Sequence, residues 1–210
     1  MKYLILAAAL LTAWALPAAA QDARHLVQTD DGASCFGYTV VDADGAEVQL
    51  PDEVRQALTC PSLASLSPDG NLLLFDDGSS VLLHDLNSNK TSIVMDLEPT
   101  VEGVSGAVWS SAGDAVLFAG VDQQHYPLLT RLYLIFLDDE AGFWLGLKDV
   151  RMNMTCGSIC ASTPGEDYRF DADGNIIYAT YDQAPYDLEG KDAERMVEPA
   201  AFEQALRPGP

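Results

Sequence analysis

The chain has 210 residues, and its 32 acidic residues outnumber its 11 basic residues, which gives a formal net charge of −21. This charge argues against nucleic acid and anionic membranes as partners, because both would be repelled at long range. With 48% hydrophobic and only 20% charged residues, the composition also differs from that of a disordered acidic tail, so we expect one folded domain.

The first twenty residues have the three-part pattern of a secretory signal peptide. Lys2 gives a basic start, an apolar run covers 3–16, and Pro17 precedes the small residues 18–20. A membrane anchor is the alternative, but the run has only about 14 residues, whereas a spanning helix needs about 20. We therefore expect cleavage after Ala20, no membrane insertion, and a periplasmic or secreted protein.

Four cysteines, Cys35, Cys60, Cys156 and Cys160, suit an oxidising compartment. They allow three connectivities, of which we favour the two local pairs, Cys35–Cys60 and Cys156–Cys160. By loop entropy the first pair would stabilise the fold by ~3.5 kcal/mol and the second by ~2 kcal/mol. Neither spacing matches the CxxC or CxxCH motif, so we predict structural disulfides and no redox site.

A turn with apolar flanks recurs along the chain, at 66–75, 109–118 and 170–178. In each copy an apolar residue stands four positions before a Gly, and Asn or Asp and an apolar strand follow. Gly supplies the positive φ of a tight turn and Asp or Asn tolerates similar angles, so each copy predicts a β-hairpin. Gly70 and Gly113 are 43 residues apart, within the ~40–45 residues of a four-stranded propeller blade.

Hairpins of a second type at 36–50, 81–95 and 132–147 complete the pattern. Together they give two, four, four and two strands, over 36–50, 63–96, 106–147 and 168–181. Twelve strands make three blades, with the first pair expected to complete the blade that the last pair begins. The predicted fold is therefore all-β, a small or incomplete β-propeller of about three four-stranded blades. A two-sheet β-sandwich is the alternative, because three blades are fewer than the roughly four of a closed ring.

Two short helices are predicted, near 51–58, where Pro51 takes the first position, and near 198–207, after Pro199. The residues before the second helix are polar. The expected organisation is thus a signal peptide at 1–20, a propeller-like repeat domain at 21–181, and a polar linker with a C-terminal helix at 182–210.

The stretch from Leu66 to Val94 contains SPDG, LLLF and VLLHDL in this order. It resembles the repeat of the TolB-like, WD-repeat-like β-propellers, which are common in exported bacterial proteins. The resemblance is best over 63–96 and 106–147. It implies a scaffold whose central face or loops bind a protein, a peptide or a small ligand. Relatives usually have six or more blades, so a homo-oligomer of two chains that completes one ring is a further alternative.

No arrangement of residues in the sequence predicts a catalytic site. Nucleophilic catalysis needs Ser or Cys beside His, with a carboxylate behind it. The chain has only three histidines, His25, His84 and His125, and no GxSxG motif. His84 lies within an apolar strand, where a structural role is expected. A hydrolase is therefore only an alternative to a non-enzymatic protein.

The acidic turns do not have the spacing of a calcium loop. In loops that start at Asp42 and Asp171, Gly45 and Gly174 fall at position 4, whereas an EF-hand needs Gly at position 6. We assign these carboxylates to the turns and keep calcium binding as an alternative.

A cluster at 151–160 brings Met152 and Met154 next to Cys156, a set of soft ligands that would suit Cu(I). A disulfide would remove the thiolates, so copper binding is also an alternative. The leading prediction is an exported, non-enzymatic binding or scaffold module for a protein or small ligand, without metal or cofactor.

Overall fold

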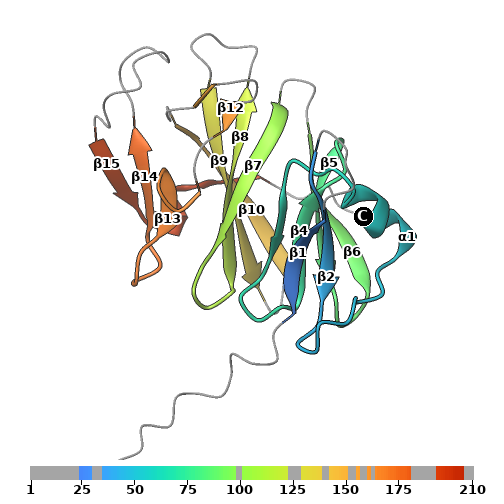
Figure 1. Ribbon diagram of the computed structural model, residues 1–210. Coiled ribbons are helices and arrows are strands. Elements are labelled where there is room, and N and C mark those ends of the chain that lie inside the picture. The colour runs from blue at the N-terminus through green and yellow to red at the C-terminus, as the bar shows by residue number, and fades with distance from the viewer. Residues whose placement is uncertain are drawn as a thin grey trace, which may run out of the picture.

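The computed structural model shows an all-β chain with an incomplete, propeller-like arrangement of antiparallel sheets (Figure 1). The structure describes residues 24–29, 35–97, 101–122, 129–138, 142–150, 155–156, 160–161, 164–180 and 193–205. The expected signal peptide, His125 and the Met152/Met154 pair lie outside these residues.

Two large sheets form the centre of the described part. The first has four strands, β3 (Ala64–Leu66), β4 (Leu72–Asp76), β5 (Ser80–Asp85) and β6 (Lys90–Asp96). The second contains β7 (Val101–Trp109), β8 (Ala115–Asp122), β9 (Leu129–Asp138) and β10 (Gly142–Val150), with β16 (Glu203–Ala205) on the edge of β10. These sheets confirm the four-stranded blades predicted over 63–96 and 106–147.

Smaller sheets lie on both sides of the central pair. One is a two-stranded ribbon of β1 (His25–Thr29) and β2 (Gly37–Val41). Another has three strands, β13 (Tyr168–Phe170), β14 (Ile176–Thr180) and β15 (Ala193–Val197). A short ribbon joins β11 (Thr155–Cys156) and β12 (Cys160–Ala161).

The two terminal sheets do not pair with each other in the described part of the chain. The prediction that 36–50 completes the blade of 168–181 is therefore wrong. Instead, β2 pairs with β1, and β14 pairs with β15. Neither β1 nor β15 was predicted. Figure 1 shows β13–β15 on one side of the second large sheet and helix α1 (Asp52–Ala57) on the other.

Helix α1 confirms the helix predicted near 51–58, with Pro51 at its N-cap. The helix predicted near 198–207 is wrong. Pro199–Ala201 forms one 3-10 turn, η2, and the chain then continues as β16. Phe202 is only 4% exposed because it packs into the core beside β14, which directs the next residues to the free edge of β10. An isolated helix of this length is marginal, so packing and strand pairing prevail.

Three hydrophobic clusters lie between successive layers. One fills the space between the two large sheets, and a second joins β8 and β9 to the sheet of β13–β15. The third lies between the first large sheet and the N-terminal layer, by which we mean β1, β2 and α1. Because the first large sheet is covered on both faces, consecutive residues such as Leu73 and Leu74 are both buried.

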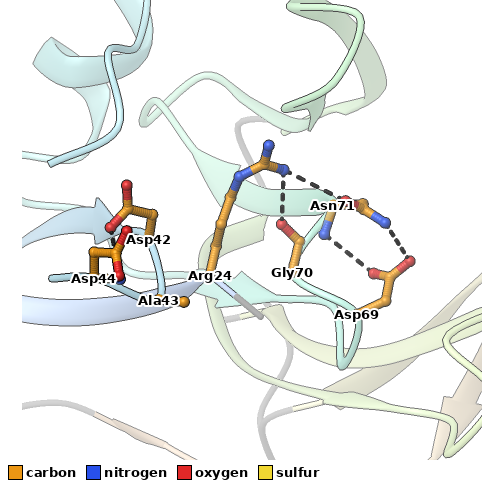
Figure 2. A pocket seen from close by; sticks show the side chains of 7 residues that line it. All are labelled: Arg24, Asp42, Ala43, Asp44, Asp69, Gly70 and Asn71. Atoms are coloured by element: carbon orange, nitrogen blue, oxygen red, sulfur yellow. Dashed lines mark hydrogen bonds between the residues drawn. The ribbon is translucent and has the colours of Figure 1, made fainter. Parts of the chain in front are cut away.

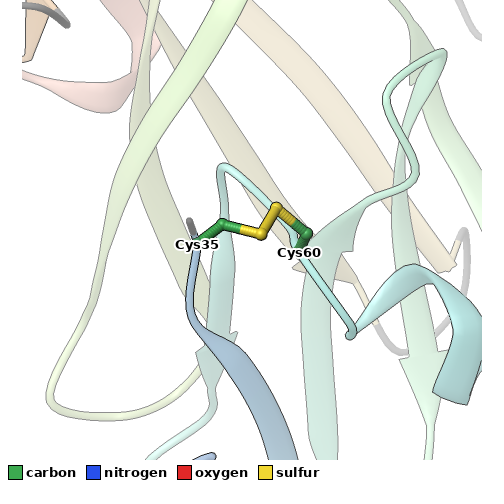
Figure 3. Close-up of a disulfide and its surroundings, with 2 residues drawn as sticks. All are labelled: Cys35 and Cys60. Atoms are coloured by element: carbon green, nitrogen blue, oxygen red, sulfur yellow. A yellow bond between two sulfur atoms is a disulfide. The ribbon is translucent and has the colours of Figure 1, made fainter. Parts of the chain in front are cut away.

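A disulfide joins Cys35 to Cys60, with 5.6 Å between their Cα atoms, and closes residues 35–60 into a loop (Figure 3). Backbone register places Cys156 directly opposite Cys160 in the β11–β12 ribbon. The second disulfide stays a prediction, since the side chains of these two cysteines are not among those described. Within the described residues, no helix is long and apolar enough to cross a membrane.

Candidate binding site at the turn end

Four related turns lie at one end of the sheets, which we call the turn end; they form the lower ends of the hairpins in Figure 1. In each turn the N–H of a Gly donates to the carbonyl oxygen three residues before it, over 2.9–3.2 Å. The four carbonyls belong to Asp42, Ser67, Ser110 and Asp171. The glycines have φ between +72° and +81°, the conformation that the repeated turn predicts for them.

Side chains complete these turns in two ways. Asp42 Oδ1 accepts the N–H groups of Asp44 and Ala46, over 3.0 and 2.9 Å. Asp171 Oδ1 likewise accepts the N–H groups of Asp173 and Asn175, over 2.9 and 2.8 Å. Ser67 Oγ instead donates to Asp69 Oδ1 over 2.6 Å and accepts the N–H of Leu72. The turn carboxylates thus serve backbone groups, and the described residues contain no cluster of three His, Cys, Asp or Glu that would hold a metal ion.

A polar pocket of about 290 Å³ opens where the N-terminal layer meets the first large sheet (Figure 2). It is lined by Arg24, Asp42, Ala43, Asp44, Asp69, Gly70 and Asn71. Figure 2 shows Arg24 between the Asp42 turn on one side and the Gly70 turn on the other. Two layers therefore contribute to one pocket.

Arg24 is held by neutral oxygen atoms. Its Nη1 donates to Gly70 O at 3.3 Å, to Asn71 Oδ1 at 3.4 Å and to Asn87 Oδ1 at 3.1 Å. Asn87 lies in the turn between β5 and β6, next to the Gly70 turn, where the N–H of Leu86 donates to Asn71 O. Among the residues that the structure describes, the partners of this nitrogen are neutral oxygens and include no carboxylate.

The carboxylate of Asp69 carries a full negative charge at neutral pH. Burial raises its pKa, but hydrogen bonds from Ser67 and from Asn71 outweigh burial and hold the pKa below 3.8. The pocket consequently presents a cation and fixed anions within one small volume. Such a pocket can bind a polar ligand that offers both a hydrogen-bond acceptor and a positive group.

No family model matches the chain, and no curated protein matches it. Among solved structures the chain is similar to an oligogalacturonate lyase in complex with manganese. The TM-score is 0.39 and the sequence identity 14%, and the match covers 87% of this chain and 61% of that one. This chain therefore spans less than two thirds of the length of that structure. A likeness of this degree says nothing about lyase activity or manganese in this chain.

His84 is fully buried in β5, and its Nδ1 lies 2.9 Å from Thr91 Oγ1 on β6. Burial lowers its pKa below the ordinary 6.5, so the ring is neutral at neutral pH. His25, by contrast, is exposed on β1. His84 therefore occupies the structural position that its apolar strand predicts.

A second pocket, of about 510 Å³, lies beside the disulfide at the other end of the first large sheet. Its notable group is Asp76, which is only 4% exposed. The two oxygens of Asp76 accept the N–H groups of Leu63 at 2.6 Å and Gly78 at 3.1 Å. Burial is the larger effect and raises the pKa of Asp76 above 3.8 despite these bonds. Asp76 thus joins the residue before β3 to the turn between β4 and β5.

No local sequence pattern indicates that Arg24, Asn71 and Asn87 lie together. Arg24 lies 63 residues from Asn87, so no local motif connects them. One signal was present: Arg24 is one of only 11 basic residues in a strongly acidic chain.

Proposed function

We propose that this protein is an exported, non-enzymatic binding module that takes a peptide segment or small polar ligand at the turn end. The observation that carries the proposal is the pocket in which Arg24 stands between two acidic turns from different layers. The Cys35–Cys60 disulfide supports an oxidising compartment outside the cytoplasm.

The pocket chemistry favours a ligand with a positive group. Asp42 and Asp69 are held by hydrogen bonds from their own turns, so their charges need no rearrangement when a ligand arrives. Arg24 supplies N–H donors for a carbonyl or carboxylate of the same ligand. A net charge of −21 also attracts cationic partners at long range. A peptide segment that contains lysine has these properties.

NMR titration of the ¹⁵N-labelled mature chain tests this proposal. The probes are Gly-Lys-Gly, Gly-Ser-Gly and Gly-Glu-Gly, added separately at low salt. We expect shifts of the Asp44, Gly70 and Asn71 amides that are largest with the lysine peptide.

Two variants make the titration specific. Arg24→Gln removes the guanidinium from the pocket and should weaken the response, whereas Arg55→Gln removes an exposed arginine that pairs with Asp52 on α1 and should leave it unchanged. A response spread over the whole surface, or one that is equal in both variants, would contradict a site at Arg24.

A further inference from the structure

The strand β5 is buried on both faces, and His84 points toward the N-terminal layer. Val81 and Leu83 belong to the cluster between the two large sheets. Leu82 and Leu86, which share the face of His84, pack against the cluster of the N-terminal layer. The cross-strand neighbour of His84 on β4 is Leu73, a member of that same cluster. His84 therefore lies beneath the N-terminal layer in apolar surroundings.

One ring nitrogen of His84 has no partner. Nδ1 is bonded to Thr91, but Nε2 is buried without a hydrogen bond, the sole buried side-chain nitrogen or oxygen of this kind among the described residues. A neutral ring tolerates this position because one nitrogen can remain a bare acceptor. Protonation makes both nitrogens donors and places a charge where no acceptor faces Nε2.

The charged groups around His84 do not offset this cost. Asp85 on its own strand and Glu53 on α1 attract the protonated ring, yet burial outweighs both and lowers the pKa. Tyr38 of β2 packs against the same cluster. The other charges of α1, Asp52 and Arg55, are exposed and paired with each other.

Residues 35–60 form a closed unit above His84. The Cys35–Cys60 disulfide joins the ends of this unit, and the N–H of Tyr38 donates to Leu58 O over 2.9 Å within it. In the part of the chain that the structure describes, β2 and β4 belong to different sheets. Apolar side chains therefore hold this unit on the first large sheet. Together with β1, which pairs with β2, the unit can separate from that sheet without breaking a strand ladder.

We propose that the N-terminal layer is an acid-sensitive cover: protonation of His84 loosens residues 35–60 from β4 and β5 and separates the two walls of the Arg24 pocket. Asp42 and Asp44 of that pocket belong to the closed unit, whereas Asp69, Gly70 and Asn71 belong to the sheet. The consequence for binding rests on the proposed function, but the loosening itself does not.

Hydrogen exchange of the ligand-free mature chain, read by mass spectrometry at about pH 7.5 and about pH 5.5, tests the proposal. With the ordinary histidine pKa of 6.5 for His84 in the loosened state, the equilibrium constant for loosening of residues 35–60 is up to about tenfold larger at pH 5.5 than at pH 7.5. We expect this increase for 38–58, after correction for the intrinsic exchange rate. The segment 115–120 of β8 should change much less.

Two variants identify the group responsible. His84→Phe keeps a ring of similar size without a titratable nitrogen and should abolish the increase, whereas His25→Phe replaces the exposed histidine of β1 and should preserve it. The proposal is overturned if His84→Phe and the native chain respond alike. It is also overturned if the native chain shows no selective increase over 38–58, a result that needs no variant to fold. A failed peptide titration would refute the proposed ligand and leave this result intact.

Discussion

Gly70 lies where Arg24, the residue before β1, comes close to the first large sheet. It has φ +72°, and an added Cβ would lie 2.6 Å from Arg24 N and 3.1 Å from Arg24 O. Both neighbours are backbone atoms, so rotation of a side chain cannot relieve the contact. We therefore predict that Gly70→Ala destabilises the protein in two ways, by backbone strain and by displacement of Arg24.

The two effects have separable magnitudes. A side chain in the left-handed region costs about 1–2 kcal/mol. Displacement of Arg24 also weakens its hydrogen bonds to Gly70 O and Asn71 Oδ1, which adds about 1–2 kcal/mol in total. The expected loss in the free energy of unfolding is therefore about 2–4 kcal/mol, measured by urea denaturation of the mature chain.

Gly174→Ala is the matched control. Gly174 occupies the same position in the Asp171 turn, with φ +81°, but an added Cβ there would meet nothing within 4 Å. This variant carries the backbone strain alone, so a loss of only about 1–2 kcal/mol is expected. Equal losses in the two variants would refute the reasoning, because they would show that contact with Arg24 contributes nothing.

Three further predictions concern stability. Replacing both cysteines of the Cys35–Cys60 disulfide by Ser should lower the free energy of unfolding by ~3.5 kcal/mol, and an unchanged urea midpoint would contradict a structural role. Phe202→Ala should cost about 3–5 kcal/mol because the ring is 4% exposed; a loss below about 1 kcal/mol would show that the C-terminal segment is not part of the core. Hydrogen bonds hold the pKa values of Asp69 and Asp85 below 3.8 despite burial, so their stabilisation is present above that pH and is lost as pH falls below it. Thermal unfolding followed between about pH 5 and about pH 2.5 should show this loss, with a smaller loss in Asp85→Asn.

The two central sheets were predictable because their information is local. A hairpin needs only a turn and its two flanks, and the spacing of Gly70 and Gly113 revealed how many hairpins make a sheet. Residues 72–75 of β4 are continuously apolar, and hydrophobic clusters lie against both faces of this strand. The turn carboxylates Asp42 and Asp171 follow the same logic, since each bonds backbone groups within four residues.

The terminal strands and the site were not predictable in this way. β16 pairs with β10 across more than fifty residues, and this pairing together with the burial of Phe202 explains why a helix does not form there. Five residues of β1 are likewise too few to show a period. A pocket composed of Arg24, the Asp42 turn and the Gly70 turn exists only after two layers have packed, which no spacing in the sequence records.

The turns nevertheless explain how an acidic surface can be specific. A free aspartate on a flexible loop attracts any cation and loses conformational entropy when it binds one. Asp69 is already fixed by Ser67 and Asn71, and Asp42 by the backbone of its own turn, so most of that entropy is lost during folding. At the proposed binding site, the distance between the two turns would favour cations that match it in shape as well as in charge. Gly70 lies directly against the backbone of Arg24, so we expect Gly70→Ala to change the width of the pocket as well as the stability of the protein.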